Sequence, residues 1–169
     1  MPWRPMTPRD LAQVQVLADA IHADHPEESR VLAERQRLYP QGCLMLVEGE
    51  KAIGYALTHP WRLGEPPPLN AQLGALPGKA TTYYIHDVAL LPEARGKGYA
   101  SQAAHMLAEH AQAAGFGNLS LVAVNRSQAF WESVGFRATA ALGLEAKLAS
   151  YGPDAVLMVR DLASPPVDA

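Results

Sequence analysis

The stretch that decides the fold reads DVALLPEARGKGYAS and spans residues 87–101. Its first part has the apolar character of a strand, and its last part opens a helix after a glycine-rich turn. Gly96 and Gly98 let the backbone approach a ligand closely, because they carry no Cβ. The free amides at the start of the helix, together with Arg95 and Lys97, favour an anion there. The sequence therefore predicts a phosphate cradle at this turn.

The rest of the chain predicts helices and strands arranged around the turn. Short apolar or β-branched runs bounded by turn residues predict strands over residues 3–6, 43–47, 52–58, 81–91, 119–124, 136–142 and 155–159. Apolar residues at helical spacing predict helices over residues 8–21, 27–38, 98–114 and 127–134. The third of these helices has a face of small residues, mostly alanine, and we expect it to lie close against a sheet.

Residues 60–80 differ from the rest in composition. Five prolines and three glycines in this segment exclude regular structure. A connection of this length is either a tolerated surface insertion or a functional element such as a lid. On the preceding predicted helix, Glu34, Arg35 and Arg37 are expected to form a solvated face.

Composition narrows the class of protein. The 169 residues, 49% hydrophobic and 18% charged, predict one globular domain. A net charge of −3 gives no reason to expect nucleic acid as a partner. Cys43 is the only cysteine, which excludes an internal disulfide and a thiolate zinc site, and its apolar surroundings predict a buried strand residue. No metal is expected.

The sequence shows no recognisable targeting feature. Residues 1–8 lack the charged and apolar regions of a secretory signal. No apolar stretch approaches the ~20 residues needed to cross a membrane. We therefore expect a cytoplasmic protein without a membrane partner.

Three phosphate-binding templates compete for the glycine-rich turn. The P-loop pattern G-x-x-x-x-G-K-[ST] does not occur in the chain. The dinucleotide fingerprint fits Gly96 and Gly98, but Ser101 stands at its third position. That fingerprint also needs an acid about 20 residues further on, where Val124 and Asn125 stand. The third template is R-x-x-G-x-A, which the turn matches in full.

Arg95, Gly98 and Ala100 match R-x-x-G-x-A, which resembles the acyl-CoA signature of the GNAT superfamily of N-acetyltransferases. A second block resembles the family's next conserved region and consists of Asn125, Phe130, Trp131, Glu132, Gly135 and Phe136. Order and spacing agree over residues 82–137. The resemblance implies a single α/β (α+β) GNAT-like domain over residues 1–163. It has a mixed, mostly antiparallel sheet of six or seven strands and helices on both faces, and residues 164–169 form a flexible tail.

The resemblance also implies acetyl-CoA as cosubstrate. The amides of Gly96, Lys97, Gly98, Tyr99, Ala100 and Ser101, with Arg95, are expected to bind its pyrophosphate. The backbone of Val88, Ala89 and Leu90, beside a β-bulge, is expected to pair with the pantetheine arm. Asn125, Phe130 and Trp131 are expected to complete the coenzyme A site. The acceptor amine attacks the thioester directly, so no enzyme nucleophile is required.

Acid and base roles are assigned by position on the central strand. Several relatives carry a Glu there, where this chain has His86 and Asp87, and these two are the candidates for the base. Strand alternation puts Tyr84 and His86 on one face and Asp87 on the other. Many relatives carry a Tyr that protonates the leaving thiolate, but here Trp131 stands at the position that aligns best. An indole N–H donates a hydrogen bond but is not a useful acid.

The acceptor remains open between alternatives. Tyr39, Trp61 and Tyr84 are expected to line its pocket, since the second helix and the loop after the third strand border that pocket in relatives. We favour a small-molecule amine, because residues 60–80 form a long loop that can act as a lid. The alternatives are a protein N-terminus or lysine as acceptor, and a non-catalytic acyl-CoA-binding sensor. The oligomeric state is also open, with a homodimer as one alternative.

Overall fold

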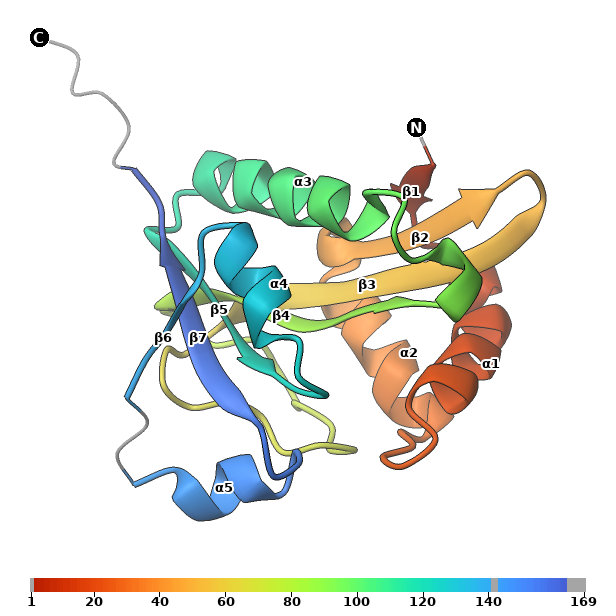
Figure 1. The fold of residues 1–169 in the computed structure, drawn as a ribbon. Coiled ribbons are helices and arrows are strands. Elements are labelled where there is room, and N and C mark those ends of the chain that lie inside the picture. Colours follow the sequence, from red (N-terminus) through yellow and green to blue (C-terminus); the bar gives the residue numbers. More distant parts are fainter. Residues whose placement is uncertain (1, 141–142, 164–169) are drawn as a thin grey trace, which may run out of the picture.

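A seven-stranded sheet runs through the part of the chain that the computed structural model describes, residues 2–140 and 143–163 (Figure 1). The strand order is β1-β2-β3-β4-β5-β7-β6, and neighbours are antiparallel except for the β4–β5 pair. The strands are β1 (Trp3–Pro5), β2 (Cys43–Glu48), β3 (Lys51–Trp61), β4 (Thr82–Leu90), β5 (Asn118–Ala123), β6 (Arg137–Ala138) and β7 (Val156–Asp161). The predicted mixed, mostly antiparallel sheet is confirmed.

Helices cover both faces of this sheet, as predicted (Figure 1). They are α1 (Leu11–Ile21), α2 (Ser29–Leu38), α3 (Tyr99–Ala113), α4 (Gln128–Ser133) and α5 (Glu145–Ala149), with short 3-10 turns at Pro8–Asp10, Pro40–Gly42 and Pro92–Ala94. Within the described ranges, none of the helices is both long and apolar enough to span a lipid bilayer.

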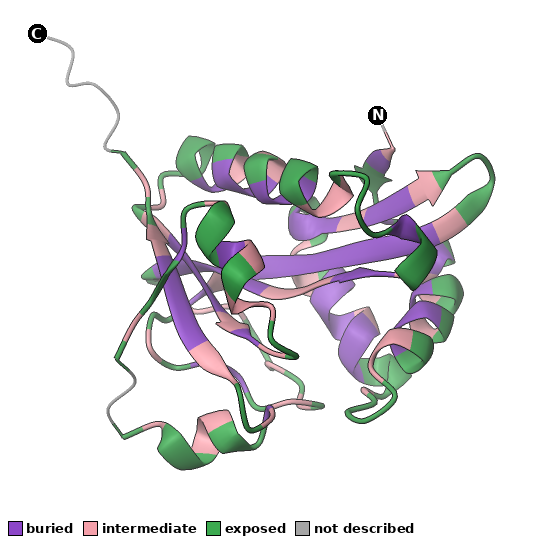
Figure 2. Cartoon of the chain, in the orientation of Figure 1, coloured by how far each residue is buried: buried purple, intermediate pink, exposed green. Residues whose placement is uncertain are grey.

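Two main layers of core hold the helices to the sheet. On one face, α1 and α2 pack through Val14, Leu17 and Leu32 onto β2 and β3. On the other face, α3 packs onto β4 and β5 through Leu107 and its buried alanines, among them Ala103, Ala104 and Ala111. Figure 2 shows the buried residues gathered along the central strands and on the helix sides turned toward them. The predicted small-residue face of α3 is therefore a core face.

The C-terminal third departs from the sequence prediction. The strand predicted over residues 136–142 is reduced to the two residues of β6, and its last two positions lie outside the described residues. Helix α5 was not predicted, because its five residues include none that is buried and so give no apolar pattern. Strand β7 lies between β5 and β6, so the last strand in sequence is not an edge strand. The predicted tail, residues 164–169, lies outside the described residues.

The irregular segment after β3 is fixed to α2. The carboxylate of Glu34 accepts hydrogen bonds from the amides of Leu73 at 2.5 Å and Gly74 at 3.0 Å. Arg35 donates to the carbonyl of Ala71 at 3.1 Å. Both side chains are buried, so the expected solvated face is wrong at these two positions. Their charged groups bind backbone amides and a carbonyl of the loop, and these contacts attach the loop to α2.

Candidate active site

The central strands β4 and β5 are hydrogen-bonded to each other over only part of their length. They pair in parallel only where Tyr83–Ile85 meets Leu119–Leu121. Beyond that point β4 continues alongside β3, from Asp87 to Leu90, without a register partner in β5. A cleft of about 660 Å³ opens between the two strand ends. Val88, Ala89 and Leu90 line it, so this edge of β4 faces the cleft.

The glycine-rich turn closes one end of the cleft. Gly96 and Gly98 have positive φ angles of 79° and 82°, a conformation that other residues adopt only with strain. Gly98 caps the N-terminus of α3, and no side chain binds the first amides of that helix. A Cβ built on either glycine meets nothing within 4 Å, so the space before these amides is open. The arrangement suits an anion such as a pyrophosphate.

The side chains of the turn divide between two directions. Arg95, Tyr99, Ala100 and Ser101 line the cleft together with the two glycines. Lys97 instead extends toward the β2–β3 hairpin, with its Nζ 3.5 Å from the Oε2 of Glu48. The hydroxyl of Tyr99 donates to the same carboxylate oxygen at 2.7 Å. Of the residues predicted for the phosphate cradle, Lys97 is therefore placed with its charge away from the cleft.

The opposite wall comes from the segment after β5. Asn125, Phe130 and Trp131, all predicted for the coenzyme A site, line the cleft. Trp131 is buried and packs edge-on between Phe130 and Phe136, with ring centroids 5.0 and 5.4 Å apart. Its neighbour Ser127 is held by a 2.6 Å hydrogen bond from its hydroxyl to the carbonyl of Val124. Aromatic packing makes this wall a shaped apolar surface.

A β-bulge in β4 rearranges the other end of the cleft. Leu57 pairs with Asp87 and the next residue of β3 pairs with Ile85, which leaves His86 as the extra residue. Because of this bulge, Asp87 contacts Tyr55 and His22, while His86 contacts Glu27, so both side chains point to the α1–α2 side. The expectation of opposite faces is therefore wrong, since it assumed an unbroken strand. The bulge directly precedes Val88–Leu90.

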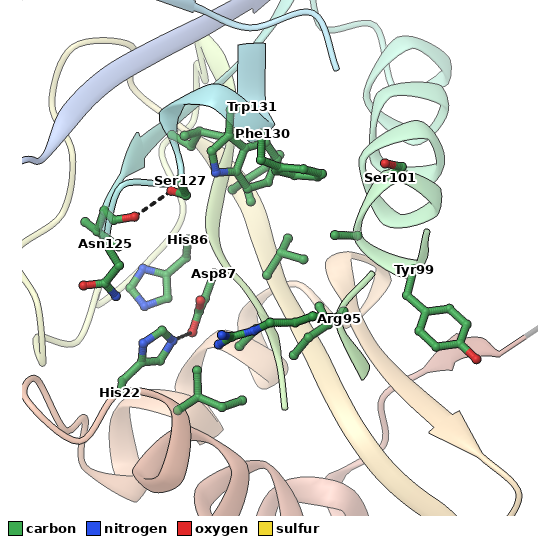
Figure 3. Close-up of a pocket in the computed structure, with 18 of the residues that line it drawn as sticks. His22, His86, Asp87, Arg95, Tyr99, Ser101, Asn125, Ser127, Phe130 and Trp131 are labelled. Atoms are coloured by element: carbon green, nitrogen blue, oxygen red, sulfur yellow. Dashed lines mark hydrogen bonds and ion pairs between the residues drawn. The ribbon is translucent and has the colours of Figure 1, made fainter. Parts of the chain in front are cut away.

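Two imidazole–carboxylate pairs result from the bulge. The Nε2 atom of His22 lies 2.8 Å from the Oδ2 atom of Asp87, which also accepts a 2.6 Å hydrogen bond from the hydroxyl of Tyr55. The Nε2 atom of His86 lies 2.8 Å from the Oε1 atom of Glu27. Figure 3 shows His22, His86 and Asp87 together at one side of the cleft, opposite Ser101 and Tyr99.

The charges of these groups are strongly coupled. Burial raises the pKa of Tyr55 well above its usual value, and the charge of Asp87 adds to the effect. Burial raises the pKa of Glu27, but the charge and hydrogen bond of His86 outweigh burial and lower the pKa to about 2. Burial lowers the pKa of His22, whereas the hydrogen bond and charge of Asp87 raise it, and the net pKa is raised.

A second, smaller cavity of about 70 Å³ continues from this end. It shares His22, His86 and Asp87 with the main cleft. Its further lining comes from five separate parts of the chain and consists of His25, Glu27, Leu69, Tyr84, Val122, Val124, Asn125 and Tyr151. Of the residues expected to contact the acceptor, Tyr84 lines this cavity.

The other two predicted acceptor residues lie elsewhere. The hydroxyl of Tyr39 lies 2.7 Å from the Nε2 atom of His110 on α3, and its ring packs on Tyr83. Trp61 is buried and donates its indole N–H to the carbonyl of Glu65 at 2.8 Å. Both aromatic rings pack against other side chains, and neither residue lines the main cleft or the smaller cavity.

The sequence prediction missed three groups of the polar network: His22, Glu27 and Tyr55. His22 follows the last residue of α1, in a stretch that reads as a polar loop. Tyr55 alternates as an ordinary core residue of β3. Only the bulge and the docking of the α1–α2 loop bring them together, and neither leaves a local pattern in the sequence. The adjacent residues His86 and Asp87 in β4 were the sequence feature that indicated a polar site at this position.

Known proteins share the fold of this chain. A family model described as Acetyltransferase (GNAT) family matches residues 11–136. No curated protein sequence matches the chain at a significant level. Among solved structures, the GphF GNAT-like decarboxylase in complex with isobutyryl-CoA superposes with a TM-score of 0.79 at 15% identity, covering 96% of this chain and 100% of that one.

Two further structures show the same fold. The loading GNATL domain of CurA from Lyngbya majuscula has a TM-score of 0.78 at 15% identity, with 94% and 96% of the two chains covered. N-acetylglutamate synthase from Neisseria gonorrhoeae, complexed with coenzyme A and N-acetyl-glutamate, has a TM-score of 0.69 at 16% identity, with 95% and 35% covered. The family match extends over most of the described sheet and both walls of the cleft. The chain belongs to the acetyltransferase (GNAT) family.

Proposed function

We propose that this protein transfers an acetyl group from acetyl-CoA to the primary amine of a small molecule. The observation that carries the proposal is the cleft between β4 and β5, which has an anion cradle at one end and a polar cavity at the other. A molecule with a pyrophosphate, an amide-bearing arm and a terminal thioester matches this order of surfaces. Structural relatives in complex with coenzyme A or isobutyryl-CoA support the choice of donor.

The donor site uses backbone more than side chains. The amides at residues 96–101 receive the pyrophosphate, with Arg95 as the cation beside it. The free edge of Val88–Leu90 pairs with the pantetheine arm as an added strand. Trp131 and Phe130 form the apolar wall opposite. The thioester then lies toward the bulge, where the two imidazole–carboxylate pairs stand.

Transfer proceeds by direct attack of the amine. The only cysteine, Cys43, is fully buried under α2, and burial raises its pKa to about 12, so it is not an acyl carrier. Trp131 offers no acidic proton, and the coenzyme A thiolate leaves toward solvent. The imidazole groups at the bulge supply the base that a protonated amine requires at neutral pH.

A small-molecule acceptor is favoured over a polypeptide. The smaller cavity is only about 70 Å³, and Leu69 of the loop and Tyr151 form part of its wall. The loop is tied down, because Glu27 accepts a hydrogen bond from the Asn70 amide at 3.1 Å and Tyr151 donates to the carbonyl of Pro67. Carboxylates of Glu27 and Asp87 in the lining attract an ammonium group.

Acetyl-CoA turnover measured by thiol release tests the function. A panel of primary amines, including polyamines and amino compounds, is compared with peptides that carry a free N-terminus or a lysine. We expect turnover with at least one small amine and a product heavier by one acetyl group. Turnover on peptides alone would replace the small molecule by a protein acceptor. Tight acetyl-CoA binding with no turnover on any amine would indicate a sensor module instead.

A further inference from the structure

We propose that His22, at the end of α1, is the general base of this transfer, and that Asp87 positions its ring. The proposal deepens the proposed acetyl transfer and rests on it. It moves the base from the central strand, where sequence position suggested His86 or Asp87, to a residue of another element. The reasons are the direction of the hydrogen bonds, the access of each ring to the cavities and the surrounding charge.

The hydrogen bonds fix which nitrogen of His22 carries the proton. The buried phenol of Tyr55 stays protonated and donates to the Oδ2 atom of Asp87. A carboxylate only accepts, so the Nε2 atom of His22, 2.8 Å from the same oxygen, is also a donor. In the neutral ring the Nδ1 atom then holds a free lone pair. Among the described residues no hydrogen-bond partner contacts this Nδ1 atom, which leaves it available to a substrate.

Access separates the two histidines. The side chain of His22 is 24% exposed, whereas that of His86 is 3% exposed and bound to Glu27. Glu27 in turn accepts the amide of Asn70 from the loop. Both histidines line both cavities, but only the ring of His22 is accessible, whereas His86 is buried and joins the bulge to the loop through Glu27.

Asp87 is poorly suited to act as the base itself. Its Oδ2 atom already accepts two hydrogen bonds, from Tyr55 and His22. Its role is to hold the imidazole in one tautomer and to stabilise the imidazolium that forms, which is the role of a positioning residue.

The groups around His22 determine its basicity. Asp87 and His86 face it from β4, Tyr55 from β3, and Glu27 and His25 from the α1–α2 loop. Arg95 lines the same cleft from the glycine-rich turn, and Figure 3 shows its side chain directed into the cleft. The net pKa of His22 is raised, since Asp87 and Glu27 outweigh burial. The raised pKa makes the neutral imidazole a stronger proton acceptor toward an ammonium group.

The step balances as follows. The ammonium group of the acceptor gives one proton to the Nδ1 atom of His22, which becomes an imidazolium. The neutral amine then attacks the thioester carbonyl and forms the new C–N bond. The tetrahedral intermediate breaks its C–S bond, and the remaining extra proton on nitrogen passes through water to the departing thiolate. His22 returns its proton to solvent, so the products are an amide, the free thiol and one proton.

The first experiment compares pH–rate profiles of kcat/KM for the wild type, His22→Ala and His86→Ala. We expect His22→Ala to lower kcat/KM at pH 7 by about 100-fold or more and to lose the rise of rate with pH that we expect of the wild type. Added imidazole should restore part of the activity of His22→Ala but not of His86→Ala. Coenzyme A affinity should stay within about twofold in His22→Ala, since the cradle lies at the other end of the cleft.

A matched control is present on the surface. His105 pairs with Glu109 on α3 at 2.8 Å, but its side chain is 73% exposed and outside the cleft. His105→Ala should therefore keep the wild-type profile. Asp87→Asn, which preserves shape, should move the rise in rate to lower pH, because the charge that raises the pKa of His22 is removed. Nitrogen-15 spectra of the wild type should show the Nε2–H tautomer at His22.

The outcomes separate this inference from the proposed function. A wild type that is active, with an unchanged profile in His22→Ala, would remove His22 as the base and leave the acetyl transfer standing. An Nδ1–H tautomer at His22 would also overturn the inference. A wild type that binds acetyl-CoA and acetylates no amine would overturn both.

Discussion

The two ends of the cleft are built in different ways. At the glycine-rich turn, residues 95–101 are contiguous, and the role we propose for them uses backbone amides held by Gly96 and Gly98. At the bulge, the polar groups come from the segment after α1, β3 and β4, and the role we propose for them uses side-chain contacts of 2.6 to 2.8 Å. A site made of contiguous backbone tolerates many side chains, whereas a site assembled from distant side chains depends on the packing that aligns them.

This contrast fits the roles we propose for the two ends, donor binding at the turn and acceptor binding at the bulge. The donor is common to acyl-CoA-dependent enzymes, and a backbone cradle recognises it with little demand on side chains. The acceptor differs between relatives, and side chains on separate elements can change one at a time. We therefore expect mutations in the turn to affect coenzyme A affinity, and mutations at the bulge to affect turnover.

The largest effect is expected from Gly98→Trp. The indole would fill the open space before the amides of α3, where a Cβ meets nothing within 4 Å, and should reduce coenzyme A affinity by at least about 100-fold. Calorimetric titration with coenzyme A measures this, and circular dichroism checks that the domain remains folded.

Gly115 provides the matched control for this variant. It lies at the other end of α3, with a positive φ of 90° and open space around it. Gly115→Trp introduces a similar backbone strain of about 1–2 kcal/mol but should leave coenzyme A affinity unchanged. Equal loss of affinity in both variants would mean that strain, and not occupancy of the cradle, is responsible.

At the bulge, Glu27→Gln should change how stability depends on pH. The pKa of Glu27 is lowered to about 2 in the folded state, so the carboxylate stabilises the fold above its unfolded pKa of about 4.3. This contribution, on the order of 2–3 kcal/mol, is lost as pH falls through about 4 toward 2. Urea unfolding at pH 5.5 and pH 3 should show a smaller decrease for Glu27→Gln than for wild type.

The next residue, Glu28, provides the control for the pH dependence of stability in Glu27→Gln. Its side chain is 56% exposed and pairs with Arg30 on the surface. Glu28→Gln should follow the wild-type decrease between the two pH values, because an exposed pair contributes little. If Glu28→Gln and Glu27→Gln behaved alike, the ion pair between Glu27 and His86 would not be the source of the pH dependence.

The difference between a contiguous turn and a site assembled from distant side chains also determines what could be predicted from the sequence alone. The strand, the turn and α3 were predicted because local patterns specify them, and Gly96, Gly98 and the alanine face lie as expected. The side-chain directions of His86 and Asp87 were predicted wrongly, because a single extra residue in β4 reverses the alternation. The contact between His22 and Asp87 joins residues 65 positions apart, and no local pattern encodes it.

The two cationic side chains of the turn point in different directions. Comparing their variants therefore distinguishes the effect of a positive charge inside the cleft from that of one outside it. Arg95 lines the cleft, whereas the Nζ atom of Lys97 lies 3.5 Å from Glu48. Arg95→Ala should weaken coenzyme A binding by about tenfold at low salt and by less at high salt. Lys97→Ala should weaken it by less than about threefold. Titrations at two salt concentrations measure both, and a larger loss for Lys97→Ala would show that its side chain turns into the cleft when the donor binds.

The smallest effect on turnover is expected from Trp131→Phe. The ring packs between Phe130 and Phe136 as part of the wall, and a phenyl group keeps most of this packing. Since the indole N–H is not an acid, its removal should change kcat by less than about twofold, with thermal stability lowered by about 1 kcal/mol from lost packing. Thiol release at saturating acetyl-CoA measures kcat. A loss of kcat beyond tenfold at unchanged coenzyme A affinity would mean that the N–H stabilises the departing sulfur, and this wall would then act through a side chain, as the bulge does.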